Sequence, residues 1–143
     1  MFQVIETLEG AYKARGGVSK TGAVAQQFEL ERRALECEVA IRHNPNHENA
    51  HLLLARFLAA RKKAREAGNQ FSEVLRINPK NGEAHFEFAT LLAQLNKRDD
   101  ALSHYRAAVH LMPDNIHASE ALSKFLAANK DLSGTDAESK SNP

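Results

Sequence analysis

The sequence lacks tryptophan and contains only one cysteine and four prolines among its 143 residues. Because Cys37 has no second cysteine to pair with, an intramolecular disulfide is excluded, and the chain is compatible with a reducing compartment. Long apolar runs are missing too, and no segment approaches the roughly 20 apolar residues that a membrane-spanning helix requires. We therefore expect one domain that folds around a hydrophobic core.

An excess of charge of one sign is also missing. Nineteen lysines and arginines oppose eighteen aspartates and glutamates, which leaves a formal net charge of +1. This balance provides no strong field to recruit nucleic acid or an anionic membrane. The opening residues, MFQVIETLEG, lack the basic start and the uninterrupted apolar stretch of a signal peptide. These absences predict a cytoplasmic protein with neither nucleic acid nor a membrane among its partners.

What the sequence does contain is an internal repeat. Pro45, Pro79 and Pro113 follow one another at intervals of 34 residues, in IRHNPNHENAH, LRINPKNGEAH and VHLMPDNIHAS. Apolar residues between them recur at helical spacing, and no segment keeps the alternation of a strand. When the prolines are aligned, equivalent positions carry similar side chains: Leu54 and Phe88, Ala55 and Ala89, Leu58 and Leu92, Ala67 and Ala101, Phe71 and Tyr105.

These residues resemble the consensus of the tetratricopeptide repeat family, W-x2-L-G-x2-Y…A-x3-F…P, in which each repeat is a pair of helices. The resemblance implies an all-α fold, a right-handed solenoid of helical hairpins with about seven helices. Small residues such as Ala55 and Ala67 would let paired helices approach closely. Each proline would follow the second helix of a repeat, where no backbone donor is needed.

The repeat register divides the chain. Residues 48–81 and 82–115 are two full repeats, residues 116–129 form a terminal half-repeat helix, and the repeat domain covers residues 1–132. Residues 133–143 are polar and predicted to be a disordered tail. Residues 1–47 resemble a degenerate first repeat, with Ile5, Leu8 and Tyr12 at the spacing of its first helix. This repeat is about a dozen residues too long, and we assign the excess to an inserted loop at residues 15–23, with Ser19 or Thr21 capping the next helix.

Two short strings in the sequence suggest chemistry. ARGGVSKTG, from Ala14 to Gly22, is similar to a phosphate-binding P-loop, but the preceding ETLEGAYKA indicates a charged helix rather than the buried strand that a P-loop follows. No apolar strand ending in a magnesium-binding aspartate follows either. We interpret its glycines as a flexible break.

The second string, HENAH, matches the H-E-x-x-H pattern of zinc peptidases. A zinc-dependent hydrolase using His47, Glu48 and His51 is therefore the alternative hypothesis. Against it, His85 stands 34 residues after His51, so a packing role explains this histidine without a metal. No third ligand is evident. We predict no catalytic residue, no metal and no cofactor.

The basic run ARKKAR, with Arg61, Lys62, Lys63 and Arg65, falls in the turn between the two helices of the first full repeat. Basic turns are usually solvated surface. A role in binding RNA or an acidic partner is the alternative, which the lack of interleaved aromatic residues disfavours.

By the resemblance, the binding groove is lined by the second, fifth, ninth, twelfth and thirteenth positions of each repeat. These positions are Asn49, Leu52, Arg56, Ala59 and Ala60, then Glu83, Phe86, Thr90, Ala93 and Gln94, then His117, Glu120, Lys124, Ala127 and Ala128. Family members that bind chaperone tails grip a peptide carboxylate with Lys, Asn and Arg. Here Glu83 and Glu87 stand where two of those groups are expected, so we expect no acidic peptide terminus as ligand.

The resemblance therefore implies a non-catalytic scaffold, adaptor or co-chaperone-like module that binds a peptide or helical segment of another protein. Phe86→Ala combined with Arg56→Glu is predicted to abolish capture of the partner and to leave the helical circular dichroism intact. A homo-oligomer is a further expectation, because Leu122, Phe125 and Leu126 lie on a last helix without a following partner.

Overall fold

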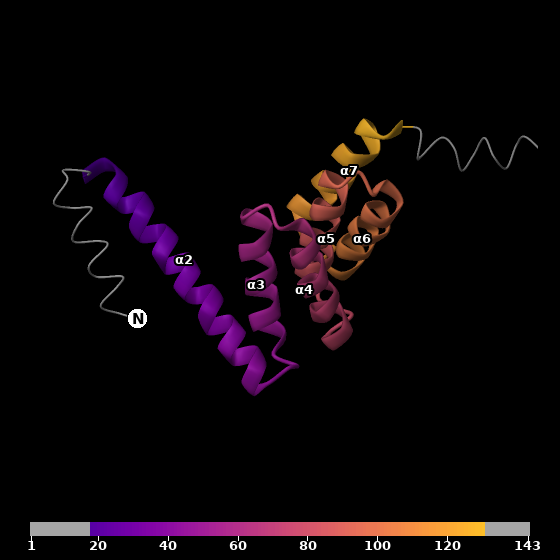
Figure 1. Cartoon of the computed structure of the whole chain (residues 1–143). Coiled ribbons are helices and arrows are strands. Elements are labelled where there is room, and N and C mark those ends of the chain that lie inside the picture. The colour runs from indigo at the N-terminus through magenta and orange to yellow at the C-terminus, as the bar shows by residue number, and fades with distance from the viewer. Residues whose placement is uncertain (1–17, 131–143) are drawn as a thin grey trace, which may run out of the picture.

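The computed structural model describes residues 18–130, which form six helices and contain no strand (Figure 1). The helices are α2 (Val18–His43), α3 (Glu48–Ala60), α4 (Ala64–Ile77), α5 (Gly82–Gln94), α6 (Arg98–Leu111) and α7 (Ile116–Ala128). The predicted all-α class is thus confirmed. The helix expected around Ile5, Leu8 and Tyr12 and the tail at 133–143 lie outside the described residues. None of the six helices is both long and apolar enough to cross a membrane.

The 34-residue interval of the sequence reappears in the helices. The helices α3, α5 and α7 begin at Glu48, Gly82 and Ile116, so each starts 34 residues after its predecessor. Each helix that precedes a repeat proline ends two residues before it: α2 before Pro45, α4 before Pro79 and α6 before Pro113. The residue before a proline is disfavoured in helical conformation, which explains this common end point.

A polar side chain caps the first helix of each repeat. The residue before the helix accepts a hydrogen bond from the backbone N–H three positions later, which satisfies one of the unpaired donors at the helix start. The pairs are His47 Nδ1 with Ala50 at 3.1 Å, Asn81 Oδ1 with Ala84 at 2.9 Å, and Asn115 Oδ1 with Ala118 at 3.1 Å.

The turns inside the two full repeats have the same backbone. Lys62 and Asn96 both adopt positive φ, at 62° and 60°. In each turn, the next residue donates its N–H to a carbonyl in the last turn of the preceding helix, Lys63 to Leu58 and Lys97 to Leu92, both at 2.9 Å. This left-handed turn reverses the chain and sets the second helix against the first.

Two clusters of buried apolar residues hold the helices together. The first joins α2 to α5 around Phe71 and Val74, which are at most 1% exposed, and the second joins α5 to α7 around Tyr105. The alanines predicted to allow close helix packing are completely buried: Ala55, Ala67, Ala89, Ala101 and Ala108. The helix pairs α3–α4 and α5–α6 pack most extensively.

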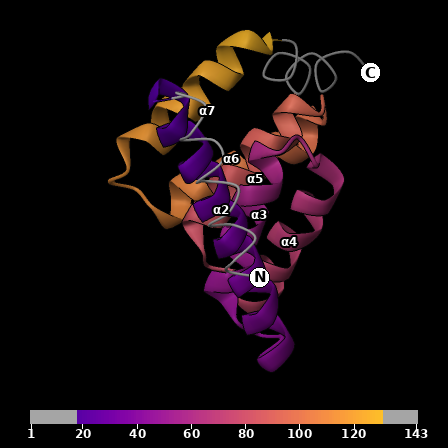
Figure 2. The ribbon, with the colours of Figure 1, turned by 60° about the vertical axis from the view of Figure 1, so that its left-hand side comes forward.

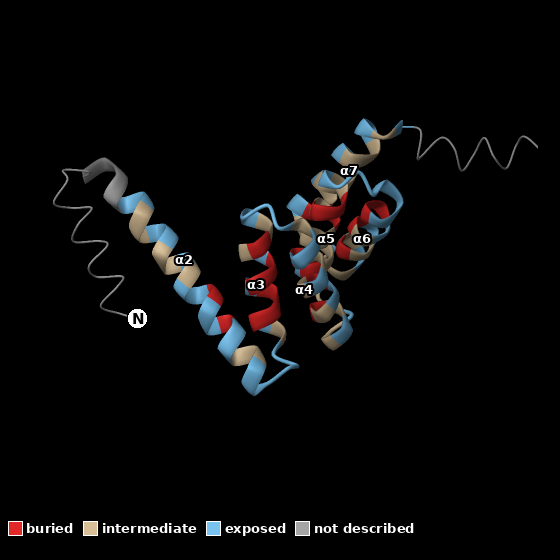
Figure 3. Cartoon of the chain, viewed as in Figure 1, coloured by how far each residue is buried: buried red, intermediate tan, exposed pale blue. Residues whose placement is uncertain are grey.

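The helix α2 packs less completely than the others. It meets α3 near the turn that joins them and leans away toward its own beginning, so the two helices form a V (Figure 1). In the turned view of Figure 2, α2 runs in front of the other helices. Burial is concentrated in α3 to α6, whereas α2 is mostly exposed or half-buried (Figure 3). Its side chains Leu30, Leu35 and Val39 are about half exposed, at 51%, 52% and 48%.

The predicted loop at residues 15–23 is wrong for its described part, because α2 begins at Val18 and runs 26 residues without a break. Ser19 and Thr21 are therefore inside a helix rather than caps. Residues 15–17 lie outside the described residues. A glycine inside a helix costs about 1 kcal/mol relative to alanine, and the helix formers that follow Gly22 in AVAQQFELERRALE offset this cost.

Candidate functional site

A depression between α3 and α5 brings together five of the residues predicted to line a binding groove. Its volume is about 260 Å³, and we call it the α3–α5 groove. It is lined by Arg56 and Ala59 from α3, Phe71 from α4, and Phe86, Glu87, Thr90, Leu91 and Gln94 from α5. The predicted members are Arg56, Ala59, Phe86, Thr90 and Gln94.

An ion-pair network crosses this groove. Arg56 Nε donates to both carboxylate oxygens of Glu87 at 2.8 Å, and its Nη2 donates to Glu83 Oε2 at 3.1 Å. The hydrogen bond to Glu87 is the main reason why the pKa of Arg56 is raised, although partial burial opposes the shift. One guanidinium therefore faces two carboxylates, and the local charge is negative. The Glu83 side chain is 64% exposed and remains open to a ligand.

The aromatic wall of the groove is fixed by a short chain of contacts. The Phe86 ring meets the edge of Tyr105 with centroids 6.1 Å apart. Tyr105 donates its hydroxyl to Thr90 Oγ1 at 3.2 Å, and Thr90 donates to the carbonyl of Phe86 at 3.1 Å. Because both hydroxyls are engaged within the protein, the groove offers an apolar surface at Phe86 rather than free hydroxyl groups.

The other predicted groove residues lie elsewhere. Asn49 and Leu52 line a second depression beside the start of α3, where Leu52 is only 5% exposed. Glu120 and Lys124 line a third, formed by α7 with the turn before it. His117 is exposed and lines none of these depressions. The structure thus groups Arg56 and Ala59 of α3 with the α5 positions and leaves Asn49, Leu52 and the α7 positions apart.

Sequence reasoning did not assign Phe71 or Leu91 to the groove. Both are almost fully buried, and they form its floor because α4 and α5 are packed together there. Phe71 stacks on Phe88 with ring centroids 5.7 Å apart. The repeat alignment predicts that Phe71 is a packing residue. That Phe71 also faces a depression depends on how α4 is rotated relative to α5, which the sequence does not show.

The side chains of HENAH are used for structure. His47 Nδ1 caps α3, and Glu48 accepts hydrogen bonds from Asn78 and Asn81 at 2.9 and 2.6 Å. His51 is 5% exposed, and its ring nitrogens contact Gln70 Oε1 at 2.7 Å and the Pro45 carbonyl at 2.8 Å. These contacts give each of the three side chains a structural role, and no group of three or more potential metal ligands gathers among the described residues.

The equivalence of His51 and His85 is confirmed. His85 Nε2 contacts the Pro79 carbonyl at 2.9 Å, as His51 contacts Pro45, and each histidine thereby ties its helix to the preceding turn. The second partner differs, because His85 Nδ1 lies 2.9 Å from His104 Nδ1, at the position where the earlier repeat has Gln70. Burial, followed by the charge of His85, lowers the pKa of His104.

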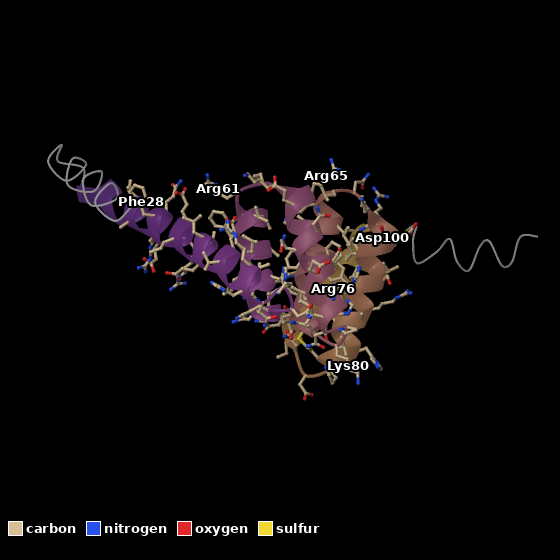
Figure 4. All side chains as sticks on the ribbon, turned by 60° about the horizontal axis from the view of Figure 1, so that its bottom comes forward. Phe28, Arg61, Arg65, Arg76, Lys80 and Asp100 are labelled. Atoms are coloured by element: carbon tan, nitrogen blue, oxygen red, sulfur yellow. The ribbon has the colours of Figure 1, made fainter. Side chains whose placement is uncertain are left out.

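The basic turn is part of the surface, as Figure 4 shows for Arg61 and Arg65. Arg61 pairs with Glu31 of α2 at 2.9 Å and places its guanidinium 5.7 Å from the centroid of the Phe57 ring. It therefore connects α3 to α2.

The expected self-association surface on α7 is partly used inside the chain. The ring centroids of Phe125 and Tyr105 lie 5.2 Å apart, and Leu122 packs on the same cluster. Self-association stays a prediction.

The architecture is that of a helical-hairpin solenoid, and comparisons with known proteins identify its class. The sequence model of the tetratricopeptide repeat family matches residues 58–124, which confirms the predicted resemblance. No curated protein matches the chain by sequence.

Solved structures with the same fold are similar over most of the chain. The first tetratricopeptide domain of Spaghetti (RPAP3), bound to the HSP90 peptide SRMEEVD, is 17% identical and has a TM-score of 0.61, with 88% of this chain and 90% of that chain covered. A crystal structure of MamA is 12% identical with a TM-score of 0.67, covering 88% and 77%. The MamA RS-1 double mutant is 14% identical with a TM-score of 0.66, covering 90% and 85%. At these identities, the likeness shows the fold.

Proposed function

We propose that this protein is a non-catalytic interaction module, a scaffold, adaptor or co-chaperone-like protein, that binds a peptide or helical segment in its α3–α5 groove. The observation that carries the proposal is the apolar surface of the half-buried Phe86 beside an exposed carboxylate at Glu83. Apolar anchors flanked by charges are the usual basis of segment recognition. The cytoplasmic location expected from the sequence belongs to this proposal.

The charge of the groove selects the kind of segment. Because Glu83 and Glu87 outnumber Arg56, a ligand with a lysine or arginine next to an apolar anchor gains attraction, and an acidic ligand is repelled. One structural neighbour is bound to SRMEEVD, whose last four residues include three acids. We infer that the present groove prefers the opposite charge.

A selection experiment tests this preference. A random peptide library is panned on the full-length protein, and the enriched peptides are synthesised and titrated by calorimetry beside SRMEEVD. Enriched peptides should carry a basic residue within a few positions of an apolar one, and SRMEEVD should bind at least tenfold more weakly. Glu83→Gln should weaken the basic peptides about two- to fivefold, since exposed charge pairs contribute up to about 1 kcal/mol.

A matched control uses a carboxylate outside the groove. Glu66 is exposed in the first turn of α4, and Glu66→Gln removes one negative charge without touching the groove lining. Equal weakening by Glu66→Gln and Glu83→Gln would show a general charge effect and would contradict the proposed site. Enrichment of acidic peptides would contradict the proposed ligand class.

The structure also changes the choice of variants. Phe86 packs on Tyr105, and Arg56→Glu would place a third carboxylate beside Glu83 and Glu87. The double variant suggested by sequence would therefore lose stability for reasons unrelated to binding. Single substitutions at exposed groove residues such as Glu83 and Gln94 separate the two effects.

A further inference from the structure

A second groove lies between α2 and α3. Its volume is about 510 Å³, and its apolar lining comes from both helices. The apolar lining residues are Leu30, Ala34, Cys37 and Ala40 of α2, with Ala50, Leu53, Phe57 and Ala60 of α3. Leu30 and Leu53 are 51% and 43% exposed. We call this hollow the α2–α3 groove.

The repeat register shows what this surface of α3 is built to contact. On α5, the residues 34 positions after Ala50 and Phe57 are Ala84 and Leu91, which are 0% and 5% exposed within the first cluster. On α7, the equivalents are Ala118, at 1% exposure, and Phe125, which packs on Tyr105. In both later repeats this face is covered by the preceding repeat.

On α3 the same face is incompletely covered. The equivalent of Leu53 on α5 is Glu87, whose carboxylate bonds Arg56 of the preceding helix α3. Leu53 itself lines the open groove. No described helix lies beside α3 in the position that α3 takes beside α5. By the 34-residue register, residues 14–26 would supply it, and their described part, residues 18–26, extends α2 instead. A helix from elsewhere is therefore missing from this groove.

We propose that the missing helix is the segment Phe2–Tyr12 of the same chain. Ile5, Leu8 and Tyr12 recur at the three- and four-residue spacing of one helix face. Glu9 borders that face. Arg33 and Glu36 of α2 both line the groove, and Arg33 pairs with Glu29 at 3.6 Å, so the apolar face rather than charge provides the match.

The length of the segment matches the groove. From Val18 to Leu30 the axis of α2 rises about 18 Å, which together with a helix separation of about 8–10 Å makes a distance of about 20 Å. The six Cα–Cα steps from Tyr12 to Val18 can span about 20–22 Å when the linker is extended. A helix of residues 2–12 is about 16 Å long, and the lining of α2 from Leu30 to Ala40 extends about 15 Å. An antiparallel segment with Tyr12 near Leu30 therefore places Ile5 beside Cys37.

The single cysteine makes this placement testable. In the full-length Ile5→Cys variant, an intramolecular disulfide with Cys37 should form in a glutathione redox buffer, since facing helices bring Cα atoms within the required distance of about 4.4–6.8 Å. Non-reducing electrophoresis and peptide mass mapping identify the bond. We expect at least tenfold more crosslinked monomer than for Thr7→Cys, whose side chain would point away from the groove. Leu8→Cys serves as a second variant one turn along the segment.

A relocated cysteine provides the decisive control. Leu35 is 52% exposed and does not line the groove, so the triple variant Ile5→Cys, Leu35→Cys, Cys37→Ser should crosslink poorly. Preferred bonding to position 35 would show that the segment lies on the other face of α2 and would overturn the proposal. Crosslinked dimers would assign the groove to a second copy of the chain. Equal or absent crosslinking of Ile5→Cys, Leu8→Cys and Thr7→Cys would show that the segment does not dock.

Discussion

At the scale of single residues, the equivalent turns in the two full repeats are filled differently. Both need a left-handed residue, at Lys62 in the first and Asn96 in the second. In this conformation the Cβ of any residue but glycine comes close to the following carbonyl. Asparagine tolerates it better than lysine, because its short polar side chain can form local hydrogen bonds. The basic run at 61–63 therefore carries a local conformational cost, which its ion pair with Glu31 through Arg61 partly offsets.

Replacing Lys62 with glycine should therefore stabilise the protein. Relief of the left-handed strain exceeds the entropy that glycine loses on folding, and we expect a gain of about 0.5–1 kcal/mol. The measurement is urea unfolding of Lys62→Gly beside Asn96→Gly, which should gain less. A destabilised Lys62→Gly protein would mean that the lysine side chain makes a contact worth more than the strain.

At the scale of helices, most of the fold follows from the sequence. The 34-residue interval and the proline stops predict how α3 to α7 follow one another along the chain. The beginning of α2 could not be predicted in this way, because Gly22 is a helix breaker by propensity while its neighbours favour a helix. The Arg56 network also escaped prediction, since it depends on how α3 and α5 are rotated relative to one another.

The pairing of α5 with α6 should depend on pH through His104. Its surroundings are His85, the Phe88 ring at 4.8 Å between centroids, and Asp100, whose charge opposes the lowering of the pKa. Because the folded state takes up a proton less readily than the unfolded state, stability is retained above about pH 6.5, the usual histidine pKa, and is lost as the pH falls below it.

The variant His104→Gln recreates the pair formed by His51 and Gln70 in the preceding repeat. Its Tm should fall less than that of the unchanged protein between pH 7.5 and pH 5, because the group that resists protonation is gone. Thermal unfolding followed by circular dichroism at both pH values measures this difference. Parallel losses in the two proteins would assign the acid sensitivity to other groups.

At the scale of the whole molecule, two grooves of different character lie on either side of α3. The α3–α5 groove is small, partly apolar and negatively charged, and we assign it to a partner segment. The α2–α3 groove is larger and more apolar, and we assign it to the segment Phe2–Tyr12 of this chain. With both assignments, the segment Phe2–Tyr12 is the first member of the layer that α3, α5 and α7 form. The layer of helices that faces the partner then begins with this segment rather than with α3.

The most direct test of the proposed function is to map where a selected basic peptide binds on the isotope-labelled full-length protein by nuclear magnetic resonance. We predict that the largest amide shift changes fall on α3 and α5 around Arg56, Glu83, Phe86 and Gln94, and that Glu83→Gln reduces them at equal peptide concentration. Changes centred on the outer surfaces of α4 and α6, or on the α2–α3 groove, would contradict the assignment of the α3–α5 groove as the binding site.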